Sequence, residues 1–132
     1  MQRSVIAFAA IIATAAPAGA LAKDGIEGRW KNGHMEILIA PCGEVLCGTV
    51  VKASPKQQAK AEHGSGTDLV GARLITNIHP TGPGTYRANV YVADRDMNAS
   101  GTIRRVGPNR LNVKGCVLLI ICKSKNWDRV GG

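Results

Sequence analysis

The sequence is poor in aromatic residues. Among its 132 residues there are two Trp, two Tyr and a single Phe. That phenylalanine is Phe8, in the N-terminal apolar segment, so the rest of the chain has only Trp30, Tyr86, Tyr91 and Trp127. These four are far apart in sequence, whereas a protein that binds single-stranded nucleic acid needs a row of aromatic side chains on which bases stack. The composition therefore argues against nucleic acid as a partner.

The sequence also lacks the local signatures of catalytic and metal sites. His34, His63 and His79 are isolated, with no H-x-H or H-x3-H spacing, and each is interpreted as a surface residue. No serine stands in a nucleophile motif, and no glycine-rich strand-to-helix turn is present to cradle a phosphate. We therefore expect a protein that is not an enzyme, with no catalytic residue, no bound metal and no cofactor.

One short pattern resembles a metal loop. Asp94, Asp96 and Asn98 form D-x-D-x-N, the opening of a calcium-binding loop. Such a loop needs glycine at its sixth position and glutamate at its twelfth, where this chain has Ala99 and Arg105. The pattern is better interpreted as a polar hairpin turn.

The chain has one long apolar run, which lies near its N-terminus. Arg3 precedes an apolar run over 5–16, and an Ala-Leu-Ala tripeptide follows at 20–22. The run is shorter than the roughly 20 residues that a membrane-spanning helix needs. A cleaved signal peptide over 1–22 is therefore predicted. Residues 23–132 are expected to form one exported domain, periplasmic or secreted.

Basic residues strongly outnumber acidic residues in the sequence. Seventeen Lys and Arg face nine Asp and Glu, a net charge of +8, which becomes +7 when Arg3 is removed with the leader. The basic residues are scattered rather than grouped in blocks, which is the usual composition of a solvated surface. The alternative is peripheral attraction to an anionic envelope surface, such as lipid headgroups or polysaccharide. Both interpretations stay open.

Four cysteines form two close pairs in sequence. An oxidising compartment favours disulfides, and the C-x4-C and C-x5-C spacings depart from those of common zinc sites. Four cysteines allow three pairings. The local pairing is favoured because residues 41–47 resemble a hairpin bend whose two arms face each other. We therefore predict disulfides between Cys42 and Cys47 and between Cys116 and Cys122.

Short apolar-rich segments bounded by turn residues predict an all-β fold. Several of them alternate, as Leu111 and Val113 do with Asn112 and Lys114, which is typical of a strand with one buried face. Eight such segments without a convincing helix favour an antiparallel meander that closes into a small barrel or sandwich. The predicted strands span residues 26–31, 35–40, 46–53, 72–78, 85–92, 101–106, 110–116 and 123–130.

Two other segments have distinctive compositions. The polar stretch over 54–68 is interpreted as one long loop, with room for a helical turn, and is a candidate lid over a cavity mouth. Residues 117–121 are five aliphatics held between two cysteines. They form either a buried bend that plugs one end of the barrel or an exposed apolar rim that admits a lipid tail or docks on a partner. The exposure of Leu118 and Ile120 separates these alternatives. Shorter turns are predicted over 79–84 and 93–98.

A three-residue motif on the first predicted strand resembles a family signature. Gly28-Arg29-Trp30 is similar to the G-x-W motif of lipocalins. In that family the tryptophan packs across the barrel floor, and a basic side chain from the end of the last strand lies over it. Arg129, two residues after Trp127, is the matching position here. The resemblance implies structural roles for these two residues and for the glycine and tryptophan of the motif.

A wider resemblance covers nearly the whole chain after residue 22. It is carried, in order, by the segments 26–30, 41–48, 69–71, 115–122 and 127–130. These are similar to a bacterial family, domain of unknown function 2147, whose members are small, exported and lipocalin-like. The resemblance implies an eight-stranded lipocalin-like barrel and supplies no catalytic residues. The region from 91 to 101 departs from the family pattern, which leaves the turn geometry there open.

Two functions from different classes are compatible with this barrel. The lipocalin-like resemblance implies a carrier or sensor for a small apolar or amphipathic molecule. The alternative is an envelope interaction module whose barrel is filled by its own side chains and whose basic exterior contacts a partner or an anionic surface. An eight-stranded barrel has the size at which either is feasible. The aliphatic walls expected around a ligand are Ile37, Ile39, Val50, Leu74, Val90, Leu111 and Val113.

The carrier hypothesis predicts where the ligand would be held. A cavity is expected to open near residues 54–68, with Tyr86 or Tyr91 and also Arg87 as tentative ligand-binding residues at its mouth. A basic side chain suits an anionic amphiphile such as a fatty acid, because a guanidinium pairs with a carboxylate. Tyr86 and Arg87 are adjacent on one strand, so at most one of them faces inward.

Overall fold

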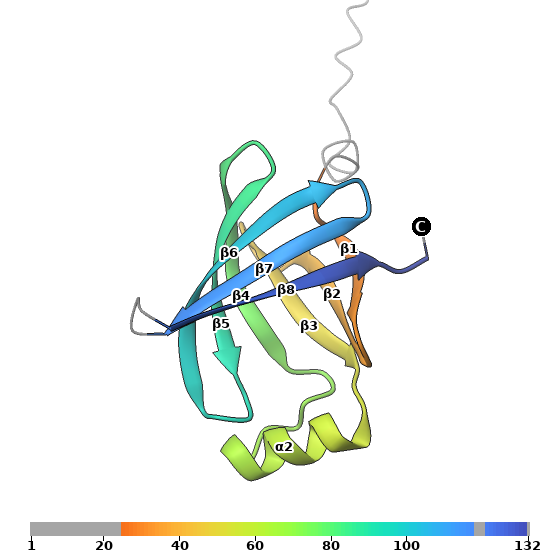
Figure 1. Cartoon of the computed structure of the whole chain (residues 1–132), viewed down its shortest axis with the longest axis vertical. Coiled ribbons are helices and arrows are strands. Elements are labelled where there is room, and N and C mark those ends of the chain that lie inside the picture. The colour runs from red at the N-terminus through yellow and green to blue at the C-terminus, as the bar shows by residue number, and fades with distance from the viewer. Residues whose placement is uncertain (1–24, 118–120, 132) are drawn as a thin grey trace, which may run out of the picture.

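Eight antiparallel strands follow one another around a closed barrel in the computed structural model, which describes residues 25–117 and 121–131 (Figure 1). Each strand pairs with the next, and the last pairs with the first. The predicted all-β, eight-stranded antiparallel meander is confirmed, and the closed barrel excludes the sandwich. The elements are β1 (Gly28–Asn32), β2 (Met35–Pro41), β3 (Leu46–Lys52), α2 (Pro55–Ser65), β4 (Arg73–Gly82), β5 (Thr85–Val92), β6 (Met97–Gly107), β7 (Arg110–Val117) and β8 (Ile121–Arg129).

The segment expected as a long loop is mostly a helix, so the absence of a convincing helix was a wrong prediction. Ser54 caps α2: its side-chain oxygen accepts from Gln57 N at 3.2 Å, and its own N–H donates to Gln57 Oε1 at 2.9 Å. Pro55 occupies the first turn, where its missing N–H is harmless, and Gly66 ends the helix in the left-handed region with φ 69°. These capping interactions stabilise a helix here despite the polar composition of the segment. Among residues 25–117 and 121–131, no helix combines the length and apolarity of a membrane span.

Strand pairing also overrides two predicted turns. β4 continues through most of the expected turn at 79–84, and Pro80 pairs with Tyr86 on β5. The register shifts on both sides of Pro80, as expected where a proline without an N–H interrupts a ladder. The turn expected at 93–98 is shorter, because β6 already begins at Met97.

Both disulfides join positions close in sequence, with the predicted pairing. Cys42–Cys47 closes the bend between β2 and β3, and Cys116–Cys122 joins β7 to β8. The second disulfide brackets the apolar segment 117–121, whose Leu118 and Ile120 lie outside the described residues. Ile121, at the start of β8, is 61% exposed.

Trp30 belongs to the core cluster and is completely buried. The expected aliphatic walls do line the interior, but most of them pack into the core cluster that contains Trp30. Ile37, Ile39, Val50 and Leu111 are buried, while Leu74, Val90 and Val113 are partly buried against this cluster. Side chains of the protein itself therefore fill much of the barrel.

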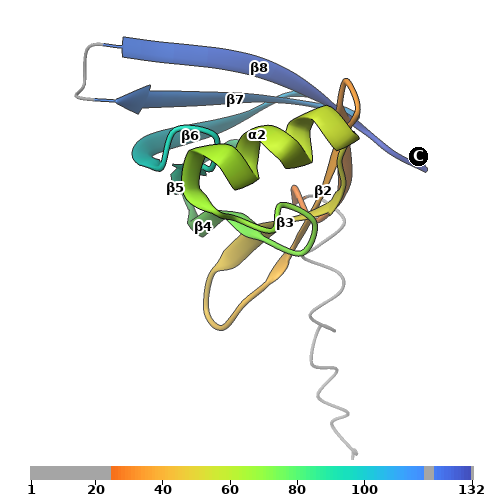
Figure 2. The ribbon, with the colours of Figure 1, turned by 90° about the horizontal axis from the view of Figure 1, so that it is seen from below.

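The two ends of the barrel differ. One end carries Ile26 and Trp30 from the first strand region and Arg129 from the end of β8. The helix lies across the other end, as Figure 2 shows from below, and we call this the α2 end. Ala61 of α2 and Leu69 just after it join the barrel core. The helix is thus packed against the barrel core through these two side chains.

Candidate functional site

The helix is anchored to the turn between β5 and β6. Ser65 Oγ donates to Ala93 O at 2.6 Å, across 28 residues of sequence. At Gly64 a Cβ atom would overlap the backbone carbonyl of Asp94, so only glycine permits this approach. Because helix and turn are in direct contact, the backbone positions from which their side chains project are fixed relative to each other.

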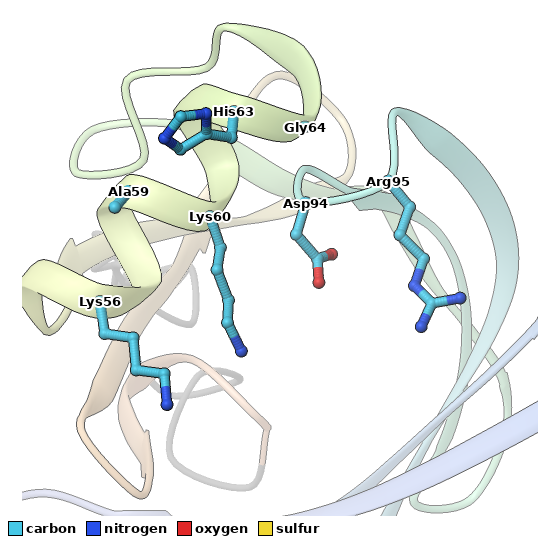
Figure 3. Close-up of a pocket in the computed structure, with 7 residues that line it drawn as sticks. All are labelled: Lys56, Ala59, Lys60, His63, Gly64, Asp94 and Arg95. Atoms are coloured by element: carbon cyan, nitrogen blue, oxygen red, sulfur yellow. The ribbon is translucent and has the colours of Figure 1, made fainter.

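A hollow of about 540 Å³ lies between α2 and this turn. Figure 3 shows Lys56 and Lys60 extending from the helix on the same side as Asp94 and Arg95 of the turn. The cavity near residues 54–68 was expected to have aliphatic walls, but this hollow is lined mainly by charged and small residues. Its lining residues are Lys56, Ala59, Lys60, His63, Gly64, Asp94 and Arg95.

The charge of this hollow is positive. Lys56, Lys60 and Arg95 face a single carboxylate, that of Asp94. Within the part of the chain that the structure describes, the ion pairs are Arg29–Glu36 and Arg110–Asp128, and both lie elsewhere. The three cations of the hollow are therefore not neutralised by salt bridges.

The D-x-D-x-N segment is confirmed as a hairpin turn, which spans residues 93–96. Its Asp96 accepts a hydrogen bond from the Tyr91 hydroxyl. In the described ranges, no group of three or more His, Cys, Asp or Glu residues is arranged to hold a metal ion. The turn contributes charged side chains to the hollow and no cation site.

A second, smaller hollow of about 290 Å³ lies along another side of α2. Its charged residues are Glu62 and Asp68, so its net charge is negative, whereas that of the first hollow is positive. The remaining lining residues are Gln58, Gly66, Thr67 and Leu69. The helix therefore separates a basic hollow from an acidic one.

The face of β8 that carries Trp127 is exposed toward the start of the strand. Trp127 pairs with Leu111, and both are buried. Because side chains alternate along a strand, Lys125 and Lys123 lie on the same face as Trp127. Both lysines are nevertheless exposed, and so are all residues from 121 to 126. The end of β8 that carries Trp127 therefore borders the buried core, while the first half of the strand extends beyond that core with both faces exposed, as Figure 2 shows for the β7–β8 hairpin.

The seam between β1 and β8 is short, which explains this exposure. The two strands pair at Trp30–Arg129 and Lys31–Asp128. Asn32 extends the contact by donating from Nδ2 to Asn126 O at 2.7 Å. Beyond this point β8 pairs with β7 alone within the described residues, so one backbone edge of its first half is unpaired.

The three expected ligand-binding residues do not come together. Tyr86 is partly buried against the core, and Arg87 is exposed and pairs with Thr102. Both lie at the start of β5, the end of that strand away from α2. Tyr91 lies near the α2 end and is held by Asp96. A mouth that combines Arg87 with residues 54–68 is therefore not formed.

The residues of the basic hollow were missed at the level of sequence. Lys56 and Lys60 are four apart, so recognition of the helix from Ser54 and Gln57 would have placed them on one face. No local signal could have placed Arg95 beside them, because the contact between α2 and the turn is tertiary.

The four expected structural residues lie at the end of the barrel away from α2. The Arg129 guanidinium lies over the Trp30 ring, which is the geometry that the lipocalin resemblance implies. Gly28 has φ 127°, and a Cβ there would come within 2.8 Å of Arg129 Nη1. The positive φ favours glycine here, and a larger residue would also displace the Arg129 guanidinium. Trp127 belongs to the same core cluster.

Comparison with known proteins supports the fold and shows the family. A solved structure, protein HP1028 from the human pathogen Helicobacter pylori, described as belonging to the lipocalin family, is similar with a TM-score of 0.62. The match covers 81% of this chain and 84% of that one at 9% sequence identity, so it supports a shared fold and nothing further. No curated protein matches the chain. The family model of an uncharacterized protein conserved in bacteria, domain of unknown function 2147, matches residues 28–129, and the chain belongs to this family.

Proposed function

We propose that this protein is an exported, non-enzymatic, lipocalin-like protein that binds one small amphipathic molecule at the α2 end of its barrel. One observation carries the proposal: the face of β8 that carries the buried Trp127 continues as an exposed face toward the start of the strand, although the core beside Trp127 is filled. Lipocalin-like barrels bind small ligands, and this face is continuous with the one that lines the core.

The exposed face has an apolar component that suits the hydrocarbon part of a ligand. Val113 on β7 is partly buried against the core, and Ile121 on β8 is 61% exposed. By strand alternation both share the face of Lys123 and Lys125. A ligand tail laid against these side chains would remove apolar surface from water, which stabilises a complex by about 25 cal/mol per Å².

The same face has a cationic component that suits an anionic headgroup. Lys123 and Lys125 rise from β8 without a salt bridge in the described structure. An ammonium group attracts a carboxylate most strongly where water is partly excluded. Of the three tentative ligand-binding residues, Tyr91 lies at this end and stays in the proposal. Tyr86 and Arg87 lie too far along β5 to contribute here.

Export is supported by the disulfides and by the leader-like sequence. Two disulfides in a chain of this size are typical of an oxidising compartment. Residues 1–22 would then be removed, and 23–132 would act as one periplasmic domain. N-terminal sequencing of protein isolated from the periplasm tests this, since the mature chain should begin at Lys23.

Titration of the mature protein with a fluorescent fatty acid tests the binding proposal. Saturable binding with a Kd below about 100 μM is expected. The Lys123→Gln/Lys125→Gln double variant should bind about tenfold more weakly. The matched control Lys31→Gln/Lys114→Gln removes the same charge from the outer face and should bind like the wild type. Equal weakening in both variants would point to net charge instead of a site.

A second candidate function is a module that contacts an anionic envelope surface. It is favoured because both hollows that flank α2 lie outside the barrel, while the barrel is largely filled. Absence of saturable fatty-acid binding, together with sedimentation on anionic vesicles, would select this function. Native mass spectrometry of protein purified from its own compartment, followed by lipid extraction, would identify a retained ligand.

A further inference from the structure

We propose that the basic hollow between α2 and the β5–β6 turn is a binding site for a phosphate group, carried by a small molecule or by a lipid headgroup. The site is separate from the exposed face of β8 and does not depend on the barrel binding a ligand. It combines cations from two elements, Lys56 and Lys60 from α2 and Arg95 from the turn.

The charge balance of the hollow favours a doubly charged anion. Lys56, Lys60 and Arg95 supply three positive charges, and Asp94 removes one. A phosphate monoester carries about −1.5 to −2 charges at pH 7 and three strong acceptor oxygens. Lysine binds phosphate as a point charge, while arginine can donate two parallel hydrogen bonds. A monocarboxylate would leave about one positive charge of the site uncompensated.

These cations are free to meet a ligand. The ion pairs among residues 25–117 and 121–131 are Arg29–Glu36 and Arg110–Asp128, which lie outside the hollow. All three basic residues of the hollow are exposed, and so is Asp94. Figure 3 shows Lys56 and Lys60 projecting from the helix to the side on which Asp94 and Arg95 also lie. Binding would therefore not require an existing salt bridge to break.

The backbone that carries these side chains is preorganised. α2 begins at a complete capping box and is bonded to the turn by Ser65, whose hydroxyl donates to Ala93 O. Gly64 and Asp94 are in direct contact through their backbones. A site whose framework is already ordered loses less conformational entropy when it binds, which strengthens affinity.

The hollow is open to solvent, so a phosphate bound there can carry a larger attached group. The neighbouring acidic hollow, with Glu62 and Asp68, would repel a phosphate, so binding is directed to one side of α2.

Isothermal titration calorimetry of the mature protein with pyrophosphate and with inorganic phosphate tests the soluble form of the ligand. Sedimentation with vesicles of phosphatidic acid, against phosphatidylcholine alone, tests the lipid form. Saturable binding in at least one arm is expected, and it should weaken as salt is raised from 50 to 200 mM, since salt screens exposed charges. Binding detected by calorimetry would show that the ligand is a soluble phosphate compound. Binding only to phosphatidic acid vesicles would show that it is a lipid headgroup.

Three variants locate the site. Lys56→Gln/Lys60→Gln should weaken binding at least about tenfold, while the control Lys31→Gln/Lys114→Gln, with the same change in net charge, should stay within about twofold. Asp94→Asn should tighten binding about threefold, because it removes the one repulsive charge. An unfolded variant would bind more weakly. A gain in affinity in Asp94→Asn therefore cannot result from a folding defect.

The proposal is overturned by any of three results. The first is the absence of saturable binding in both arms at millimolar ligand. The second is equal weakening by the two double lysine variants, which would mean that only the overall charge of +7 attracts the anion. The third is an unchanged or weaker affinity in Asp94→Asn with the fold intact by circular dichroism.

Discussion

The guanidinium carbon of Arg129 lies 4.2 Å from the centre of the Trp30 ring. Arg129 also donates from Nη1 to Glu27 O at 2.9 Å and from Nη2 to Gly25 O at 3.5 Å. The Trp30 indole donates from Nε1 to Ile26 O at 2.9 Å. The end of the last strand is thus bound both to the ring on the first strand and to the backbone that precedes it, which closes the barrel at this end.

The surroundings of Arg129 affect its protonation only slightly in practice. Burial, and after it the nearby charge of Arg105, lower the pKa of Arg129 from its ordinary value. A guanidinium titrates so far above neutrality that it stays charged under physiological conditions. The contact with Trp30 is therefore expected to be independent of pH over the range in which the protein functions.

Replacing Trp30 should be strongly destabilising. Trp30→Ala removes a fully buried ring from the core cluster, and the free energy of unfolding should fall by about 3–5 kcal/mol in urea titrations. Lys31→Ala, at the exposed next position, should change it by no more than about 0.5 kcal/mol. A loss below about 1 kcal/mol for Trp30→Ala would show that the resemblance to the G-x-W motif is accidental.

Replacing Arg129 by lysine tests whether the guanidinium shape matters. Arg129→Lys keeps the charge but loses the planar fork that contacts Trp30, Glu27 and Gly25. The free energy of unfolding should fall by about 1–2 kcal/mol. Arg110→Lys is the matched control, because Arg110 forms an exposed pair with Asp128 and should contribute below about 1 kcal/mol. Equal effects of the two substitutions would contradict a special role for Arg129.

A methyl group at Gly64 should separate α2 from the β5–β6 turn. In an isolated helix, alanine is better than glycine by about 0.5–1 kcal/mol. Here the added Cβ would overlap Asp94, so Gly64→Ala should instead destabilise by about 1–3 kcal/mol. Gly82→Ala serves as the control, because a Cβ there meets nothing within 4 Å. A stabilised Gly64→Ala protein would mean that helix and turn are not in contact in solution.

The disulfide pairing can be checked by peptide mapping without reduction. Peptides that link Cys42 to Cys47 and Cys116 to Cys122 are expected. Replacing Cys42 and Cys47 together by serine should lower the free energy of unfolding by about 2 kcal/mol, since the loop that they close is short. Detection of Cys42 linked to Cys116 or Cys122 would refute the arrangement.

The strands were predictable because their signal is local. Alternation in segments such as 110–116 reflects one buried and one exposed face, and in β7 Leu111 is buried and Val113 packs against the core while Lys114 is exposed. The α2 helix was missed although Ser54, Gln57 and Gly66 provide complete capping signals. The polar composition of 54–68 was given more weight than the caps. The sequence predicts a turn at Pro80, but pairing with β5 extends the strand past it.

The sequence by itself determined the properties that depend on neighbours along the chain: strand segments, the two short disulfide loops, the positive charge and the family motif. Only the tertiary structure decided which distant segments meet. Arg129 reaches Glu27 across 102 residues, and Ser65 reaches Ala93 across 28. Such contacts depend on how strands close around the core and on close approaches such as that of Gly64, and no local pattern encodes them. The basic hollow at α2 is a product of that packing.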